Sequence, residues 1–310
     1  MTGERWALAL HGGAGVEKGR DYGRAEALLE GLVLMGADRL KRGDLALDVV
    51  EALTSAMEDS GLFVAGRGSA PNRLGRVELD ASLMCGRSRR AGAVASLRGY
   101  PSPVRVARRV MQNTPHVLLV GQGAAEFALG EGFDPIGDFA SWTRDPDGFE
   151  PEDLTDGHGT VGAVALDRGG HLAAATSTGG TYGALPGRVG DSALIGAGCW
   201  ADGDVAVSCT GEGEAFIKAS AASDLSARLR YAGQDLRDAA NSVLETVSRR
   251  GGDGGLIAVS KSAEIIMAFN TDGMKRASAS WNQPARVGSI GQQLRLAEPL
   301  VIPISPQPDW

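Results

Sequence analysis

The stretch Asp156-Gly157-His158-Gly159-Thr160-Val161-Gly162-Ala163-Val164-Ala165-Leu166-Asp167 passes from a glycine turn directly into an apolar run. Val161, Ala163 and Ala165 would lie on one face of a strand, with Val164 and Leu166 on the other. Thr160 stands where the turn meets the strand. A β-branched Thr suits the start of a strand, so an ordinary buried strand is one interpretation.

The second interpretation is that the chain cleaves itself between Gly159 and Thr160. Thr160 would then carry both a nucleophilic hydroxyl and a basic α-amine. A free α-amine has a pKa of about 7.7–8.0, so at pH 7 part of it can accept the hydroxyl proton. Residues 130–158, rich in Gly, Asp and Pro, would supply a loose tail before the cut. Within that tail, His158 is either a helper in cleavage or an ordinary loop residue.

Several motifs together resemble the plant-type asparaginase and isoaspartyl peptidase family of N-terminal nucleophile hydrolases. Gly159 to Asp167 is similar to the family's cleavage site, and the likeness runs from about Ala7 to about Met274. The other motifs follow in the family's order: Leu10-His11-Gly12-Gly13-Ala14-Gly15, Ala65-Gly66-Arg67-Gly68-Ser69, Glu78-Leu79-Asp80-Ala81-Ser82, Ala175-Thr176-Ser177-Thr178-Gly179-Gly180, Pro186-Gly187-Arg188-Val189-Gly190-Asp191-Ser192 and Ser208-Cys209-Thr210-Gly211. The resemblance implies a threonine amidohydrolase that hydrolyses β-aspartyl peptides and L-asparagine through a β-aspartyl ester of Thr160.

Composition narrows the class of protein further. The chain has 310 residues and a formal net charge of −7, which argues against a nucleic-acid or membrane-surface role. No segment reaches membrane-spanning length and no apolar leader is evident, so we expect a cytoplasmic protein. The three cysteines have no CxxC spacing, which suggests neither a disulfide framework nor a zinc site.

Apolar periodicity predicts an α+β fold in which antiparallel sheets are covered by helices. The family implies a four-layer αββα sandwich, with residues 1–310 forming one domain that is cleaved into chains 1–159 and 160–310. Asp44 is expected to cap the second helix. Strands are expected at 6–10, 76–84, 91–97, 117–120, 161–166, 172–176, 205–209, 256–260 and 264–269. Helices are expected at 25–40, 45–58, 104–111, 124–129, 213–231 and 236–249, and residues 303–310 are expected to be loose.

Arg188 and Asp191 form a charged pair in one loop. A guanidinium binds a carboxylate through two parallel contacts, and a carboxylate binds an ammonium. The two residues could therefore recognise the α-groups of an amino acid, or could simply form a surface ion pair. The resemblance implies the first role, with an aspartyl residue or a dipeptide as substrate.

Thr210 and Gly211 end a predicted strand just before a helix that starts near Gly213. Backbone N–H groups at a helix start favour negative charge, so a hydroxyl and an N–H there could hold a tetrahedral oxyanion. The resemblance assigns Thr210 and Gly211 this work and implies that Gly211 and Gly213 also touch the substrate. It further implies that Thr178 supports the nucleophile, although a Thr at a strand end can equally cap a turn.

The loop from Met57 to Arg67 matches a family loop whose carbonyl groups bind sodium, a hard cation suited to oxygen ligands. The resemblance thus implies a structural sodium ion and no organic cofactor, and an assembly of two αβ heterodimers. The residues concerned are Met57, Glu58, Ser60, Phe63, Ala65 and Arg67.

One position departs from the family pattern, which usually reads Phe-Asn-Ala-Gly where this chain has Phe63-Val64-Ala65-Gly66. The side chain of valine has no hydrogen-bonding group, so we expect a slower enzyme that handles asparagine less well than larger β-aspartyl dipeptides. Two alternatives stay open. One is a glycosylasparaginase, which needs room for a sugar; the other is an uncleaved relative that serves as a binding scaffold.

Overall fold

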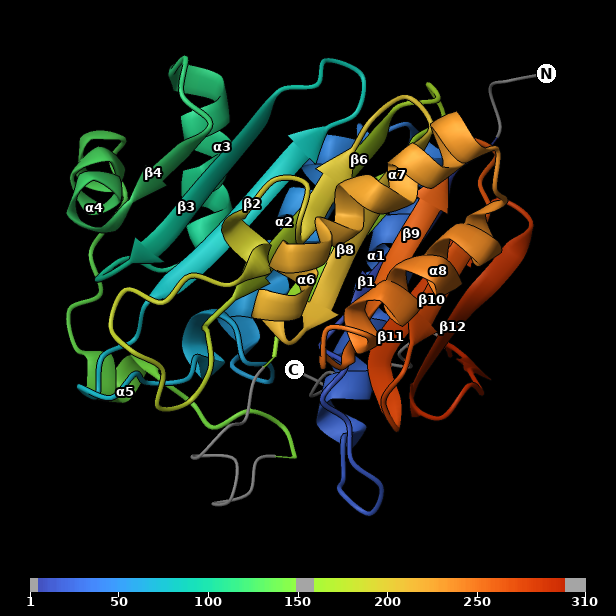
Figure 1. Ribbon diagram of the computed structural model, residues 1–310. Helices are drawn as coiled ribbons and strands as arrows, with labels where there is room; N and C mark the ends of the chain where they lie inside the picture. Colours follow the sequence, from blue (N-terminus) through green and yellow to red (C-terminus); the bar gives the residue numbers. More distant parts are fainter. Residues whose placement is uncertain (1–4, 149–158, 299–310) are drawn as a thin grey trace, which may run out of the picture.

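Two β-sheets packed face to face form the middle of the molecule, and helices cover both outer faces (Figure 1). The structure is a computed structural model that describes residues 5–148 and 159–298. Three apolar cores separate its layers, one between the sheets and one beneath each set of helices. This arrangement confirms the expected four-layer αββα sandwich.

The larger sheet contains nine strands and carries the predicted cleavage site near its centre. Neighbouring strands within this sheet are antiparallel, except that the pair formed by residues 91–97 and 118–120 is parallel. In spatial order the strands are β13 (Arg295–Leu296), β12 (Gln283–Ile290), β11 (Gly273–Ser280), β1 (Ala7–His11), β5 (Val161–Leu166), β6 (Leu172–Thr178), β2 (Leu79–Cys85), β3 (Ala91–Leu97) and β4 (Leu118–Val120).

The smaller sheet is antiparallel, in the order β10 (Ile265–Phe269), β9 (Gly254–Ser260), β8 (Val205–Gly211) and β7 (Cys199–Ala201). It is covered by α6 (Gly213–Ala219), α7 (Ala221–Ala232) and α8 (Leu236–Ser248). The nine-stranded sheet is covered by α1 (Gly23–Arg42), α2 (Ala46–Ser60), α3 (Pro103–Asn113) and α4 (Gly121–Gly130). A short helix, α5 (Phe139–Trp142), follows them in the chain.

Strand β5 shows how alternation in the sequence produces these layers. Val161, Ala163 and Ala165 pack in the core beneath the helices, whereas Val164 and Leu166 pack in the core between the sheets. Successive side chains of a strand point to opposite faces, so a strand that is apolar on both faces must be covered on both. The predicted faces of this strand are confirmed.

Several local predictions were wrong. Ser220 adopts a left-handed conformation (φ 49°) and divides the helix expected at 213–231 into α6 and α7. Asp44 does not cap α2, because the N-cap residue is Leu45 and the Asp44 carboxylate instead accepts a hydrogen bond from Arg39 at 2.7 Å. The backbone N–H of Ala46 is satisfied from far along the chain, by the carboxylate of Asp167 at 3.1 Å.

Five elements were not predicted from the sequence, namely α5, β7, β11, β12 and β13. Strand β11 is buried throughout yet contains Lys275 and Arg276, so its apolar period is interrupted. Sheet pairing on both sides stabilises it in spite of that composition. The strand expected to begin at residue 76 begins at Leu79. His158 and residues 303–310 lie outside the described residues.

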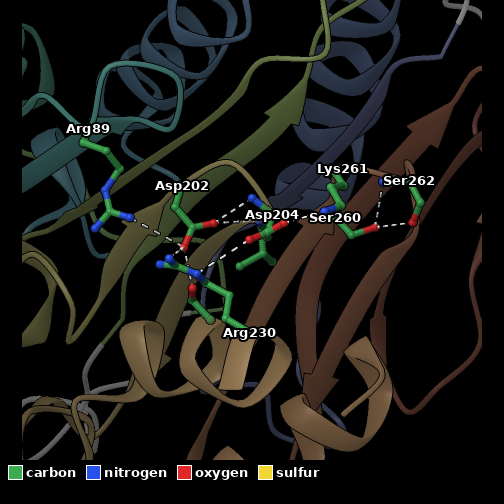
Figure 2. Close-up of polar contacts among 9 residues, drawn as sticks. Arg89, Asp202, Asp204, Arg230, Ser260, Lys261 and Ser262 are labelled. Carbon is green, nitrogen blue, oxygen red and sulfur yellow. Dashed lines mark hydrogen bonds and ion pairs between the residues drawn. The ribbon is translucent and has the colours of Figure 1, made fainter. Parts of the chain in front are cut away.

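A polar cluster at one end of the four-stranded sheet joins the two halves of the chain (Figure 2). Asp202 lies 3.7 Å from Arg89 and 3.8 Å from Arg230, and it also accepts a hydrogen bond from Ser226. The guanidinium of Arg89 lies 4.3 Å from the ring centroid of Trp200. This contact connects the turn after β2 to the smaller sheet. Both Arg89 and Trp200 are far from Thr160 in the sequence.

Candidate active site

Thr160 lies immediately before β5, between the ends of the neighbouring strands β1 and β6, and only 4% of it is exposed. The glycine cluster after β1 packs against the backbone of Thr160. An ideal Cβ on Gly13 would lie 3.5 Å from the carbonyl oxygen of Thr160 and 3.6 Å from its nitrogen. Gly13 has φ +100°, a conformation that favours glycine. The turn therefore brings backbone close to the proposed nucleophile.

The carbonyl group of Gly159 is held by Thr178, whose hydroxyl donates a hydrogen bond to the carbonyl oxygen at 2.5 Å. The same hydroxyl accepts a hydrogen bond from the backbone N–H of Gly180 at 3.1 Å, which directs its proton towards Gly159. Antiparallel pairing of Val161 with Ser177 places these two strand ends together. Thr178 thus contacts the proposed scissile bond itself and is buried there.

Val64 lies against the same bond. An ideal Cβ on Gly159 would lie 2.9 Å from the Cβ of Val64 and 3.0 Å from its Cγ2. The carbonyl oxygen of Val64 accepts a hydrogen bond from Gly179 at 2.9 Å. The position where this chain departs from the family pattern therefore touches the predicted cleavage site.

Thr210 reaches the site from the other sheet. It is fully buried at the end of β8, and its hydroxyl accepts a hydrogen bond from the backbone N–H of Ala14 at 3.3 Å. Gly13 contacts Thr160 and its neighbour Ala14 contacts Thr210, so one glycine turn joins the two threonines. Gly211 ends β8 with φ +143°, and α6 begins at Gly213, as expected from the sequence.

Arg188, Asp191 and Gly213 lie close together. An ideal Cβ on Gly213 would lie 3.0 Å from Nη2 of Arg188 and 3.1 Å from Oδ1 of Asp191. The ion pair of Arg188, however, is with Glu214, whose carboxylate accepts hydrogen bonds from Nε at 2.8 Å and Nη2 at 2.7 Å. The alternative of a surface pair between Arg188 and Asp191 was therefore wrong, because Asp191 is buried.

Glu214 is a residue that the sequence interpretation missed. It occupies the Nε edge of the Arg188 guanidinium, which leaves the Nη1–Nη2 end as the edge able to make two parallel contacts with a ligand carboxylate. The ion pair with Arg188 lowers the pKa of Glu214, so this carboxylate is charged at neutral pH. Glu214 directly follows Gly213, a predicted substrate contact, so its position in the sequence could have identified it as a candidate site residue.

Two buried carboxyl groups flank the guanidinium. Desolvation raises the pKa of Asp191 to about 7, against the opposing effect of Arg188. Burial likewise raises the pKa of Asp80 to about 7, although its carboxylate accepts a hydrogen bond from the N–H of Ser96 at 2.8 Å. Oδ2 of Asp191 has no hydrogen-bond partner within the described part of the chain. This buried, unsatisfied oxygen is suited to receiving the ammonium group of a ligand.

His11 is a second residue missed from the sequence. It is completely buried, and Nε2 lies 2.8 Å from the hydroxyl oxygen of Ser208, which in turn lies 2.7 Å from that of Thr176. Desolvation lowers the pKa of His11 to about 3, so the imidazole is neutral. His11 pairs with Gly162 across the strands, and an ideal Cβ on Gly162 would lie only 2.4 Å from Nε2. The chain of hydrogen bonds links both sheets directly beneath the site.

The loop after α2 folds its carbonyl groups towards the short 3-10 turn at Gly66–Gly68. An ideal Cβ on Gly66 would lie 2.3 Å from the carbonyl oxygen of Glu58, and one on Gly68 would lie 2.1 Å from that of Phe63. Burial raises the pKa of the Glu58 carboxyl group to about 8. Among the described residues, no group of three or more His, Cys, Asp or Glu side chains is placed to hold a metal ion.

Comparison with known proteins adds an independent finding. A family profile described as Asparaginase matches residues 4–145 and 139–289. An isoaspartyl peptidase of Salmonella typhimurium is 44% identical over 294 residues, covering 87% of this chain and 94% of the relative. A plant-type L-asparaginase of Pyrobaculum calidifontis is 42% identical over 300 residues, with 90% and 98% covered. A human isoaspartyl peptidase/L-asparaginase is 39% identical over 287 residues, with 88% and 92% covered.

Within the described ranges, no helix is both long enough and apolar enough to cross a membrane.

Proposed function

Because the chain belongs to the asparaginase family, we propose that it is a self-cleaving threonine amidohydrolase that releases L-aspartate from β-aspartyl (isoaspartyl) peptides and from L-asparagine. The observation that carries the proposal is the hydrogen bond from Thr178 to the carbonyl oxygen of Gly159, directly before the buried Thr160. A polarised carbonyl beside a hydroxyl-bearing residue at the start of a rigid strand is the arrangement that self-cleavage needs.

In the proposed maturation step the hydroxyl of Thr160 attacks the carbonyl carbon of Gly159. Charge develops on the carbonyl oxygen, and the Thr178 hydroxyl already donates to that atom. The peptide nitrogen takes up the proton lost by the Thr160 hydroxyl and leaves as the α-amine of Thr160 as the C–N bond breaks, and water hydrolyses the resulting ester. The products are chains 1–159 and 160–310, which remain within one domain.

In turnover the new α-amine takes the proton of the Thr160 hydroxyl, and the oxygen attacks the β-carbonyl of the substrate. The hydroxyl of Thr210 and the N–H of Gly211 hold the oxyanion, while Thr178 orients the nucleophile. The leaving amine takes the proton as the C–N bond breaks, which leaves a β-aspartyl ester on Thr160. Water then releases aspartate and restores the hydroxyl, and no step calls for an organic cofactor.

The aspartyl α-groups are bound by Arg188 and Asp191, next to Gly213. The Nη1–Nη2 end of the Arg188 guanidinium binds the α-carboxylate, since Glu214 holds the other edge. The unpaired Oδ2 of Asp191 receives the α-ammonium. The expected substrate is therefore a small molecule or a dipeptide with both α-groups free. We propose neither nucleic acid nor a membrane as a partner.

We further propose that a sodium ion binds in the loop from Met57 to Arg67. The carbonyl groups of Glu58 and Phe63 already turn towards the glycines of this loop, where a Cβ would collide with them, and such oxygens suit a hard cation. Bound there, the ion would fix the segment that places Val64 against Gly159. We further propose that two αβ heterodimers assemble and that the protein is cytoplasmic.

The experiment that tests the proposal is intact mass measurement followed by an assay with β-aspartyl-leucine. The wild-type protein should yield two chains and release aspartate, and Thr160→Ala should yield one inactive chain. Fragments formed equally well by Thr160→Ala would point to a contaminating protease. Release of aspartate from glycosyl-asparagine but not from β-aspartyl-leucine would favour a glycosylasparaginase, and one uncleaved, inactive wild-type chain would favour a binding scaffold.

A further inference from the structure

A second polar layer lies beneath the proposed site and consists of His11, Gly162, Thr176 and Ser208, which we call the support layer. Resting on the proposed function, we propose that the support layer holds Thr160 in its reactive position and that His11 is a positioning residue for self-cleavage and turnover. In this role the layer acts through packing and hydrogen bonds, and none of its side chains takes part in the bond changes.

The strand register places the support layer two residues away from the site on each segment. Gly162 of β5 stands opposite His11 of β1 and opposite Thr176 of β6, while β8, which carries Ser208, packs against β5 and β6 from the other sheet. Side chains two residues apart on a strand point to the same face. The pairs formed in this way are His11 with Gly13, Gly162 with Thr160, Thr176 with Thr178, and Ser208 with Thr210.

Gly162 provides the space that the layer needs. Its φ is not positive, so the backbone does not require a glycine there. An ideal Cβ on Gly162 would lie 2.0 Å from Oγ of Ser208 and 2.4 Å from Nε2 of His11. Any larger residue would therefore displace the imidazole or the hydroxyl, and the packing of these two groups across the strand explains the glycine.

The direction of each hydrogen bond follows from one end of the chain of hydroxyl groups. The hydroxyl of Thr176 donates its only proton to the carbonyl oxygen of Gly198 at 3.1 Å. It therefore accepts from Ser208 at 2.7 Å, and Ser208 in turn accepts from Nε2 of His11 at 2.8 Å. The imidazole thus carries its proton on Nε2. Its Nδ1 has no hydrogen-bond partner among the described residues.

His11 also contacts the residue that it would position. Desolvation lowers the pKa of His11 to about 3, and a contact with the backbone of Thr160 opposes that shift. A general base needs a pKa near the working pH, which a completely buried imidazole of this kind does not have. A neutral group that keeps the same hydrogen bonds at every working pH is suited to fixing geometry.

The other end of the chain reaches the residue proposed to bind the substrate's α-ammonium. An ideal Cβ on Gly198 would lie 2.5 Å from the carbonyl oxygen of Asp191 and 2.8 Å from its Oδ2. The carbonyl oxygen of Gly198 also accepts a hydrogen bond from the N–H of Cys209 at 2.9 Å. The support layer therefore runs from Thr160 to Asp191 and would fix the distance between the nucleophile and the substrate.

The test is the rate of self-cleavage, followed by intact mass over time, in two variants whose new side chains have equal length. His11→Gln places an amide near the position of Nε2, whereas His11→Met has no donor there. His11→Met should slow self-cleavage about tenfold or more, because it leaves the Ser208 hydroxyl buried with one bond fewer, and His11→Gln should recover most of the rate. In the matured fraction, His11→Met should lower kcat for β-aspartyl-leucine without changing KM, since Arg188 and Asp191 are intact.

Ser208→Ala breaks the same chain without changing His11, and Ser226→Ala is its matched control. Ser226 is also a buried serine, and its hydroxyl donates to Asp202 in the polar cluster described above. Both variants should lower the melting temperature, but only Ser208→Ala should slow self-cleavage. The double variant His11→Met/Ser208→Ala should be no slower than the slower single variant, because groups in one hydrogen-bond network do not contribute additively.

Equal rates for His11→Gln and His11→Met would overturn the inference. So would an equal slowing by Ser226→Ala and Ser208→Ala, or an additive loss in the double variant. Each of these outcomes leaves the proposed function standing if the wild type cleaves itself and hydrolyses β-aspartyl-leucine. A wild-type protein that does neither would reject the proposed function, and the inference with it.

Discussion

Gly159→Ala is expected to slow self-cleavage because the added methyl group collides with Val64. Gly159 does not have a positive φ, so its backbone can accept alanine. Among the described residues other than its chain neighbours, Val64 supplies the nearest atoms to the new Cβ, with its own Cβ at 2.9 Å and its Cγ2 at 3.0 Å. Overpacking of this kind costs about 1–3 kcal/mol. Relief of the contact would move the Gly159 carbonyl away from the Thr178 hydroxyl, which now lies 2.5 Å from it.

If that whole cost enters the barrier, cleavage slows about 5-fold to about 150-fold, at tenfold for each 1.36 kcal/mol. The assay is the fraction of uncleaved chain by intact mass over time after purification. Val64→Gly removes both colliding atoms and Val64→Ala removes only Cγ2, so the first should rescue Gly159→Ala more fully than the second. Such a cycle measures the coupling directly. An equal slowing by Gly159→Ala in all three backgrounds would refute the steric explanation.

Three further predictions concern recognition, rate and stability. Arg188→Lys should still cleave itself but should lose most hydrolysis of β-aspartyl-leucine, because lysine cannot hold Glu214 and a substrate carboxylate together; normal hydrolysis would contradict its role. Val64→Asn should raise asparagine turnover more than β-aspartyl-leucine turnover, and unchanged rates in fully cleaved enzyme would remove position 64 from the chemistry. Burial raises the pKa of Glu58 to about 8, so the folded state holds this proton more tightly than the unfolded state and stability should fall as pH rises from about 4.5 to about 8. Glu58→Gln should weaken that fall in a series of melting temperatures, and an identical pH dependence in the variant would count against it.

Much of the fold could be predicted from alternation in single strands. In β5, five apolar residues divide between the two cores as their spacing indicates. The same reasoning failed for β11, where Lys275 and Arg276 interrupt the apolar period and pairing with β1 and β12 supplies the stability. It also failed at Ser220, where one left-handed residue divides a helix that has no Gly or Pro at that position.

Sequence motifs predicted individual candidate residues of the site, but they did not predict the contacts between those residues. The motifs name Thr160, Thr178, Arg188 and Asp191 as candidates, and the structure brings the members of each pair together. The hydrogen bond of Thr178 to the carbonyl of Gly159 depends on strand register, which no motif states. Glu214 and His11 were missed for related reasons. Each makes a contact between distant segments, with Arg188 in one case and Ser208 in the other.

Self-cleavage would make Thr160 the N-terminal nucleophile of a second chain, and the N-terminal sequence of the purified, stored protein shows whether it does. We predict two chains, one ending at Gly159 and the other beginning Thr160-Val161-Gly162-Ala163. Thr160→Ala, purified and stored in parallel, should remain a single chain of 32.0 kDa. A wild-type protein that stays one chain while hydrolysing β-aspartyl-leucine, or a second chain that begins at any residue other than Thr160, would show that Thr160 is not the N-terminal nucleophile.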